Sequence, residues 1–286
     1  MTTTATDSII SAARNIRLPD HSLSPALSVK DAGRIATEHN VSIRDVEITA
    51  LENAIIPERY IRNRTSLSLQ DQITLLQKSV CIVGLGGLGG TVSEMLARLG
   101  VGKLILIDGD VFEDSNLNRQ LLSTMKTLGA SKAQSAAYRV NLVNPAVEVV
   151  CHTEFLTAEN AHRLTSDAPD LIIDCLDNVK TRFLLEDLAR KSGSVMVSGA
   201  VAGNTGQVTT IFPEDPGLVR IYGNPDKLPE RGVEVHLGTL PYAVALVAVL
   251  ECAEATKVLL NRGIPLRNKL LIINPLENLY EIMQIG

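Results

Sequence analysis

The first stretch of this chain whose residues could do chemistry is a glycine-rich hexapeptide. Its glycines are Gly84, Gly86, Gly87 and Gly89, set between an apolar run and a helix-like segment. Glycine lets the backbone approach phosphates closely, and the free N–H groups at a helix start favour negative charge. Asp108 ends the next apolar run about 20 residues on, where a carboxylate can accept hydrogen bonds from ribose hydroxyls. These residues alone indicate an adenine nucleotide, with NAD as the default.

The polar residues that follow Asp108 favour ATP over NAD. They are Asp110, Asn116, Arg119, Gln120 and Lys132. A dehydrogenase does not need an Asn, an Arg and a Lys just beyond its ribose-binding acid. The charges of a triphosphate do call for Arg and Lys donors, and Arg can bind two oxygens at once. Each residue is a weak signal alone, but together and in this order they predict an ATP site.

A later run, Asp174-Cys175-Leu176-Asp177-Asn178, supplies a candidate metal ligand. It follows an apolar strand, which places Asp177 at the edge of the sheet where α/β folds bind ligands. Mg²⁺ takes one or two protein carboxylates plus substrate phosphates, and Asp177 suits that role. We interpret Asp174 as a structural residue that caps or orients the loop.

Two further polar residues near this run have more than one interpretation. Asn178 is expected to bind the nucleotide. Arg182, four residues later, either lies on the nucleotide side or forms an ion pair on a helix surface.

Composition sets the broad class of the protein. The chain has 286 residues, of which 45% are hydrophobic and 21% charged, typical of a soluble globular protein. The net charge of −5 argues against a nucleic-acid surface. No apolar run approaches the roughly 20 residues that a bilayer requires, and no signal peptide is visible. We expect a cytoplasmic protein that binds neither nucleic acid nor membrane.

The four cysteines, Cys81, Cys151, Cys175 and Cys252, do not form a CxxC pair. This spacing argues against a structural zinc site and against a disulfide framework. Cys81 and Cys175 lie in apolar runs, where buried thiols are expected.

Strands alternating with helices predict an α/β fold with a Rossmann-like, mostly parallel sheet and helices on both faces. The expected strands are Val80–Val83, Lys103–Ile107, Val147–Cys151, Leu171–Asp174 and Ser194–Ser198. The expected helices are Leu67–Gln77, Thr91–Leu99, Lys132–Asn141, Ala158–Leu164 and Thr181–Lys191.

The two ends of the chain differ from this alternation. The C-terminal half predicts a strand Gln207–Phe212, a long polar loop over 215–236, a helix Pro241–Leu260, and antiparallel strands Lys269–Ile273 and Leu279–Met283. Residues 1–28 predict a flexible or draped arm. Two short helices follow, Val29–Glu38 and Ile43–Asn53, the second with Ser42 as its N-cap. We expect residues 1–57 to form an arm and a small helical extension for packing or docking, and residues 58–286 to form the ATP-binding domain.

The ordered motifs resemble the ThiF/MoeB/HesA adenylyltransferases, the bacterial relatives of ubiquitin-activating enzymes. They are RYIR at 59–62, GLGGLG at 84–89, DGDVFEDSNLNRQ at 108–120, SKAQSA with Lys132, DCLDN at 174–178 and SGAVAGNTGQV at 198–208. The resemblance covers most of the chain from Arg59 onward and leaves out its first part.

The resemblance implies an enzyme that uses ATP and Mg²⁺ to adenylate the C-terminal carboxylate of a ubiquitin-like sulfur-carrier protein ending in Gly-Gly. Asp108 would hold the ribose and Asp177 the Mg²⁺. Asn116, Arg119 and Lys132 would bind phosphates and stabilise the transition state. Arg62 resembles an arginine that reaches across a homodimer to the partner's ATP; the alternative is a surface arginine in a linker.

The sequence departs from the family pattern in two places. Many members hold zinc with two CxxC pairs, which are missing here, so we expect no zinc. Members that form a thioester or persulfide need a cysteine in the crossover loop, and none lies between Cys175 and Cys252. Cys252 lies in an apolar helix, where a buried thiol is expected. We therefore expect adenylation without a covalent thiol intermediate, with a sulfurtransferase acting afterwards.

Other functions remain open at this stage. The enzyme could adenylate a tRNA-linked carboxylate or a peptide, although the acidic balance counts against tRNA. A non-catalytic scaffold for carrier or nucleotide is a second alternative, disfavoured because the catalytic set is present. An NAD oxidoreductase is disfavoured because no His or Tyr accompanies the glycine loop.

Overall fold

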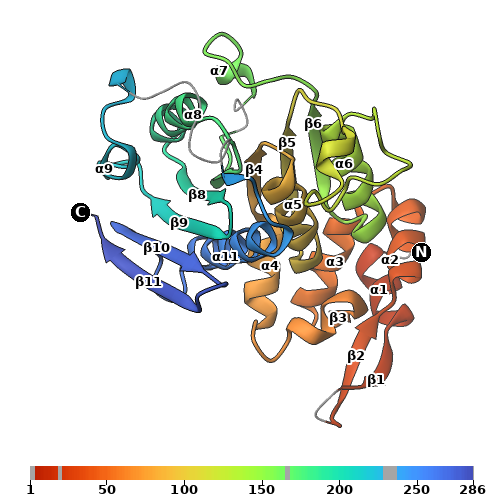
Figure 1. The fold of residues 1–286 in the computed structure, drawn as a ribbon. Helices are drawn as coiled ribbons and strands as arrows, with labels where there is room; N and C mark the ends of the chain where they lie inside the picture. The colour runs from red at the N-terminus through yellow and green to blue at the C-terminus, as the bar shows by residue number, and fades with distance from the viewer. Residues whose placement is uncertain (1–3, 19–20, 165–167, 228–236, 286) are drawn as a thin grey trace.

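The main sheet of the protein has eight strands, described in a computed structural model that covers residues 4–18, 21–164, 168–227 and 237–285 (Figure 1). In sheet order the strands are β11 (Leu279–Gln284), β10 (Lys269–Asn274), β9 (Thr205–Ile211), β8 (Val195–Ala202), β7 (Leu171–Asp174), β4 (Ser79–Val83), β5 (Lys103–Ile107) and β6 (Glu148–His152). Strands β8, β7, β4, β5 and β6 are parallel to one another, and β9, β10 and β11 continue the sheet in antiparallel pairs that begin at β8. The predicted fold class is confirmed.

Helices cover both faces of this sheet because its strands carry apolar residues on both sides. Val80 and Ile82 of β4 pack in a cluster with α5 (Gly87–Leu99), α6 (Lys132–Val143) and α11 (Pro241–Leu260). Cys81 and Val83 face the opposite cluster, formed with α7 (Ala161–Leu164) and α8 (Val179–Ser192). Successive strand residues point to opposite faces, so a continuous apolar run marks a strand buried on both sides.

Strand order reverses at β4, which has β7 on one side and β5 on the other. The chain leaves β4 into the glycine loop, β5 into Asp108, and β7 into Cys175. In open α/β sheets, ligands bind beyond the carboxyl ends of the strands at such a reversal. The sheet therefore brings the glycine loop, Asp108 and the loop that carries Asp177 to one edge.

The N-terminal residues form a folded module instead of the predicted arm. It contains α1 (Ala5–Ala12), β1 (Arg14–Arg17), β2 (Leu23–Leu27), α2 (Val29–His39), α3 (Ile43–Glu52) and β3 (Ile56–Pro57), with sheet order β1-β2-β3. The arm prediction is wrong for residues 4–18 and 21–28. A few apolar side chains far apart in the sequence, among them Ile9, Leu27 and Ile35, build a separate buried cluster that local composition does not reveal.

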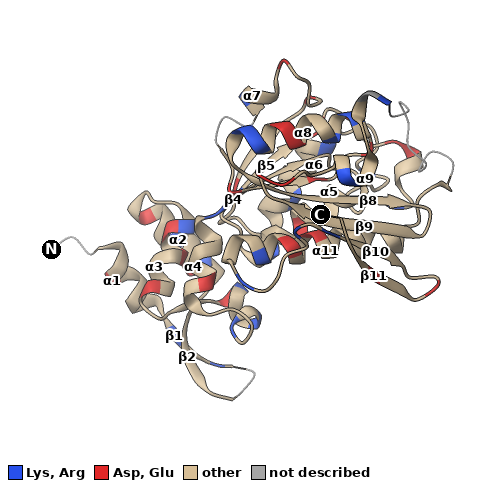
Figure 2. Cartoon of the chain, turned by 90° about the vertical axis from the view of Figure 1, so that its left-hand side faces the viewer, with Lys and Arg blue, Asp and Glu red and all other residues tan. Residues whose placement is uncertain are grey.

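Capping residues start the module's helices as local sequence rules require. Ser42 accepts a hydrogen bond from the Asp45 N–H at the start of α3, as predicted. Thr4 and Asp7 form a reciprocal capping box at α1, a signal that the polar composition of the segment hid. The module lies at one end of the molecule, away from β8–β11, and its acidic and basic residues are intermixed (Figure 2).

The two segments between the module and β4 are η1 (Glu58–Asn63), a 3-10 helix, and α4 (Leu69–Gln77). The predicted polar loop over 215–236 contains α9 (Val219–Tyr222) and η3 (Pro225–Lys227), and its remainder from 228 lies outside the described residues. None of the described helices meets the length and apolarity that a membrane span needs.

Candidate active site

Two glycines of the loop after β4 are required by close backbone contacts. Gly84 has φ +87°, and a Cβ there would lie 2.7 Å from the Cys175 carbonyl oxygen. A Cβ on Gly89 would overlap the Gly84 carbonyl. The glycine turn therefore packs tightly against the loop after β7. The loops that follow the neighbouring strands β4 and β7 are thus in direct contact.

The start of α5 leaves its N–H groups available. Gly86 is the N-cap, and no side chain among the described residues caps the helix. The first N–H groups of a helix need partners from outside the helix, and an anionic ligand can supply them. Gly86 and Gly87 therefore stand where a phosphate could approach, as the sequence predicts.

Asp108 connects the loops after β4 and β5. Its Oδ2 accepts a hydrogen bond from the Leu85 N–H at 2.6 Å, and its Oδ1 accepts one from the Asp110 N–H at 2.8 Å. Carboxylate oxygens have lone pairs for more than one donor. Ribose binding by Asp108 stays a prediction, and the bonds shown hold this carboxylate beside the glycine loop.

Lys132 begins α6 and forms an ion pair with Asp110, with 2.6 Å between Nζ and Oδ2. The Lys132 side chain is 8% exposed and that of Asp110 is 49% exposed. Partial burial opposes ionisation of Asp110, but the hydrogen bond and charge of Lys132 outweigh it and hold the pKa of Asp110 below its usual value. The Lys132 ammonium group is thus held in place by a carboxylate that is partly exposed to solvent.

Three residues from the segment around η2 (Asp114–Asn116) differ in how they are held. Asn116 is buried, and its Oδ1 accepts a hydrogen bond from the Glu113 N–H at 3.1 Å. Arg119 is partly exposed and donates from Nη1 to the Ser115 carbonyl and to Asn118 Oδ1, each at 2.9 Å. Within the described residues its Nε and Nη2 have no hydrogen-bond partner, so they could donate to a phosphate.

Gln120 turns toward the glycine loop. Its Nε2 would be 3.3 Å from a Cβ on Gly86, and its Oε1 is buried with no hydrogen-bond partner among the described residues. A buried acceptor without a partner is costly, which is typical of a site that a ligand or water completes.

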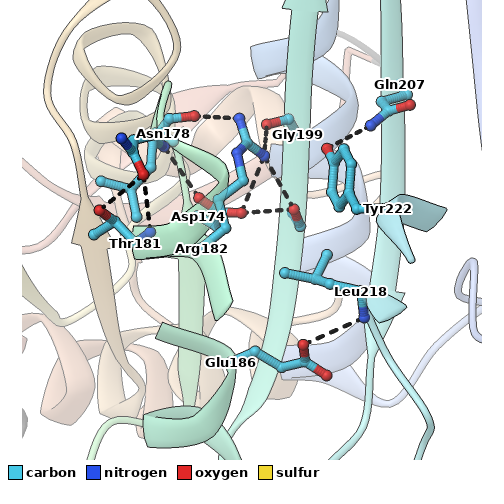
Figure 3. Close-up of polar contacts among 12 residues, drawn as sticks. Asp174, Asn178, Thr181, Arg182, Glu186, Gly199, Gln207, Leu218 and Tyr222 are labelled. Atoms are coloured by element: carbon cyan, nitrogen blue, oxygen red, sulfur yellow. Dashed lines mark hydrogen bonds and ion pairs between the residues drawn. The ribbon is translucent and has the colours of Figure 1, made fainter. Parts of the chain in front are cut away.

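Arg182 lies in a buried network (Figure 3), so of its two interpretations the ion pair on a helix surface is wrong. Its Nη1 donates to Asp174 Oδ2 at 3.1 Å and to the Gly199 carbonyl at 2.8 Å, and its Nη2 donates to the Leu176 carbonyl. Only 4% of the residue is exposed, because α8 turns this face onto the sheet. Arg182 therefore supports the loop after β7, and its contact with nucleotide stays a prediction.

Asp174 is structural, as interpreted from the sequence. It is fully buried and accepts hydrogen bonds from Ser198 Oγ at 2.6 Å and from the Leu176 N–H at 3.1 Å, besides the ion pair with Arg182. These contacts fix the backbone that leads to Asp177. Ser198 is a supporting residue whose role sequence reasoning missed, although it lies in a quoted motif.

Asp177 is exposed just beyond this buried network. Asn178 follows it as the N-cap of α8, with its Oδ1 accepting a hydrogen bond from the Thr181 N–H at 3.1 Å (Figure 3). No group of three or more metal-ligating side chains occurs in the described part of the chain. A single exposed carboxylate on a rigid loop suits Mg²⁺ that is shared with phosphates, because Mg²⁺ keeps several waters.

Glu251 is a second residue that the sequence analysis missed. It is fully buried in the middle of α11, with Cys175 Sγ 3.9 Å from each of its carboxyl oxygens. Burial, and then the nearby charge of Asp174, raise the pKa of Glu251 well above its usual value. The available signal was a carboxyl in the middle of a largely apolar helix.

The thiols are in surroundings that disfavour the thiolate. Burial raises the pKa of Cys81 to about 12 and raises those of Cys151, Cys175 and Cys252 above the usual value. The thiolate is the nucleophilic form of cysteine, so none of these side chains is activated for attack. The prediction of buried thiols is confirmed for Cys81.

Arg62 is exposed on η1, at the far ends of the helices that begin in the site. Tyr60 on the same turn contacts Gly100, the residue that ends α5. Because α5 has 13 residues, this end lies roughly 20 Å from the glycine loop at 1.5 Å per residue. An arginine side chain is much shorter than that, so Arg62 is separated from the other predicted site residues of its own chain.

Comparison with known proteins shows that the sequence matches a protein family. The sequence model of the ThiF family matches residues 60–286. The SAMP-activating enzyme E1 of Haloferax volcanii is 34% identical over 229 residues, covering 78% of this chain and 83% of that protein. The sulfur carrier protein adenylyltransferase of Thermus thermophilus is 36% identical over 224 residues, covering 73% and 79%.

Another relative is longer than this chain. The adenylyltransferase and sulfurtransferase MOCS3 of Drosophila yakuba is 36% identical over 219 residues. The match covers 76% of this chain and 48% of MOCS3, so the chain spans about half of that relative.

Among solved structures, E. coli MccB with MccA-N7isoASN aligns with a TM-score of 0.67 and 20% identity, covering 89% of this chain and 83% of that one. This share exceeds what residues 60–286 account for, so the likeness of fold extends into the N-terminal module. At this identity the likeness concerns the fold alone.

Proposed function

Because this chain is an adenylyltransferase of the ThiF family, we propose that it transfers AMP to the C-terminal carboxylate of a ubiquitin-like sulfur-carrier protein that ends in Gly-Gly. The observation that carries this proposal is the convergence of the glycine loop, Lys132, Arg119 and Asp177 at one sheet edge. The names of the Haloferax and Thermus relatives support the carrier as acceptor.

The reaction is an in-line displacement at the α-phosphorus of ATP. One carboxylate oxygen of the carrier forms the new bond to phosphorus, the bond to the β-phosphate oxygen breaks, and pyrophosphate leaves. A carboxylate is already ionised at neutral pH, so the chain need not remove a proton. Its task is to hold the two reactants in line and to stabilise the charge that develops.

The chain's own residues suit that task by position. The N–H groups at the start of α5 bind phosphate oxygens, and Lys132 and Arg119 offset charge on the phosphates. Asp108 orients the ribose from its place beside the loop. Asp177 would hold Mg²⁺, which neutralises phosphate charge when bound.

Arg62 acts on a second copy of the chain in this proposal. Its place at the far end of α5 separates it from its own nucleotide site, so it would complete the site of a partner subunit in a homodimer. There it would stabilise the leaving pyrophosphate, as an arginine finger does.

The same proposal excludes a covalent thiol intermediate. Burial raises the pKa of the four cysteines, and no cysteine lies between Cys175 and Cys252. A variant in which all four cysteines are replaced by Ser or Ala should still form acyl-adenylate if it folds. A carrier–enzyme thioester on Cys252 would contradict the thiol-free reaction.

Exchange of labelled pyrophosphate into ATP tests the function. We expect exchange only when Mg²⁺ and a Gly-Gly carrier from a panel are both present. The matched control is the same carrier without its last glycine, which should support none. Exchange with no carrier of the panel would refute the proposed acceptor, and exchange with a peptide or tRNA in its place would identify a different one.

Complementation tests the shared site. Arg62→Ala and Asp177→Ala proteins should each be inactive, and mixing them should restore about a quarter of the sites, because half the dimers are mixed and each has one complete site. A mixture that stays inactive after proven subunit exchange would place Arg62 outside the partner's site.

A further inference from the structure

A buried ion pair connects the N-terminal module to the turn that carries Arg62. Nε of Arg59 on η1 lies 2.9 Å from Oε1 of Glu47 on α3, and the two side chains are 12% and 1% exposed. The Arg59 guanidinium also donates from Nη1 to Oδ1 of Asn144, the residue that ends α6. One arginine thus joins three parts of the protein: the module, η1 and the ATP-binding domain.

The residues on either side of Arg62 are held as well. Nδ2 of Asn144 donates to the Tyr60 hydroxyl at 2.9 Å. Nδ2 of Asn63 donates to Gln72 Oε1 at 3.0 Å, and Nε2 of Gln72 donates to the Leu99 carbonyl at 3.0 Å. Arg62 itself stays exposed between these anchored neighbours. The turn is therefore fixed while its arginine side chain projects outward.

Glu47 stands out because a carboxylate is costly to bury. Burial raises its pKa and the positive charge of Arg59 opposes that effect. A buried ion pair often adds little net stability compared with apolar residues of the same size, but removal of one partner leaves the other charge buried and uncompensated. The residue also lies outside residues 60–286, the part that matches the family, so the family match does not account for it.

We propose that Glu47 is a positioning residue for the shared site: through Arg59 it fixes η1, so that Arg62 is presented to the nucleotide of the partner subunit. The N-terminal module then holds in place the turn whose arginine acts in the partner subunit's site. This inference rests on the proposed function, and in particular on Arg62 acting across the dimer. A small displacement of such a group can lower the rate on the order of 10²-fold.

The test uses the complementing mixture, in which the two chains have different tasks. The Asp177→Ala chain lends its Arg62, and the Arg62→Ala chain contributes the working nucleotide site. Glu47→Gln is placed first on the lending chain and then, in a separate mixture, on the working chain. Pyrophosphate exchange is measured with the carrier that supports exchange in the unmodified mixture.

We expect the restored rate to fall on the order of tenfold or more when Glu47→Gln is on the lending chain. On the working chain the rate should stay within about twofold, since that chain's Arg62 is already absent. The matched control is Glu38→Gln, which removes the exposed ion pair with Arg34 in the same module and should change neither mixture.

Equal losses in both mixtures would mean that Glu47 only stabilises the fold, and no loss in either would mean that it does not act on Arg62; both results overturn the inference. If the unmodified mixture is itself inactive, the shared site fails instead. Should Glu47→Gln not fold, Tyr60→Phe removes only the hydroxyl that Asn144 contacts. It must give the same one-sided loss for the inference to stand.

Discussion

The two ends of α5 and α6 differ in how their polar groups are used. At their starts, α5 has no side-chain cap among the described residues, Gln120 Oε1 beside it lacks a partner there, and Lys132 pairs with the half-exposed Asp110. At their far ends, the buried Asn144 donates to the Tyr60 hydroxyl, and the buried Gln72 donates to the Leu99 carbonyl. Unpaired groups at the starts suit a ligand, whereas the hydrogen bonds of Asn144 and Gln72 hold a neighbouring segment in place.

The largest expected effect on activity comes from the predicted nucleotide site, near the starts of α5 and α6. Asp177→Ala removes the exposed carboxylate that would hold Mg²⁺, and the rate of pyrophosphate exchange should fall by about 10³-fold or more. The melting temperature should change little because the side chain is exposed. Near-normal exchange in this variant would mean that the metal is held elsewhere.

Lys132→Ala and Arg119→Ala should follow, each lowering the exchange rate on the order of 10²–10³-fold, the usual loss for one transition-state donor. The matched control is Lys126→Ala, which removes an exposed lysine from the same region and should leave the rate unchanged. Equal behaviour of Lys126 and Lys132 variants would show that charge in the region, and not its placement, matters.

A change at the far ends of α5 and α6 should lower the stability of the fold. Asn144→Ala removes the buried hydrogen bonds from Asn144 Nδ2 to the Tyr60 hydroxyl and to the Ala97 carbonyl, which should cost about 2–3 kcal/mol in the free energy of unfolding. Urea unfolding with an unchanged slope would measure it. The KM for ATP should stay within about twofold, since the contact lies at the opposite end of α6. A large change in KM with unaltered stability would remove the distinction between the two ends.

The smallest effect is expected midway between the ends, where Glu94 of α5 pairs with Arg139 of α6 at 2.8 Å. The hydrogen bond from Arg139, with further help from Arg98, holds the pKa of Glu94 below its usual value of 4.5. The ionised carboxylate therefore stabilises the fold above about pH 4.5, and this contribution is lost as pH falls toward the folded pKa.

Glu94→Gln should accordingly lower stability at pH 7 by about 1 kcal/mol, because the arginine partners are partly exposed. The difference from the unmodified protein should shrink as the pH is lowered below about 4.5. A constant difference across that range would show that packing, not charge, makes the contribution.

Most of the sheet could be predicted because its signals are local. Strands Lys103–Ile107 and Leu171–Asp174 and helix Pro241–Leu260 have the bounds expected from apolar runs and a proline at a helix start. Glycine turns and N-caps can also be predicted, because a few consecutive residues specify them. Helix boundaries shifted by a few residues, as with α5, which begins at Gly87 because the glycine loop itself starts the helix.

By itself the sequence determined the parallel strands and the position of the glycine loop, Asp108 and Asp177 just after the ends of three of them, because local patterns and chain order specify these features. Only the tertiary structure decided that the first residues fold into a module, that Arg182 is buried against Asp174, and that Arg62 lies at the far end of α5. These outcomes depend on contacts between residues far apart in the chain, such as Glu47, Arg59 and Asn144. No short-range pattern marks such contacts, because each partner alone has the character of an ordinary surface residue.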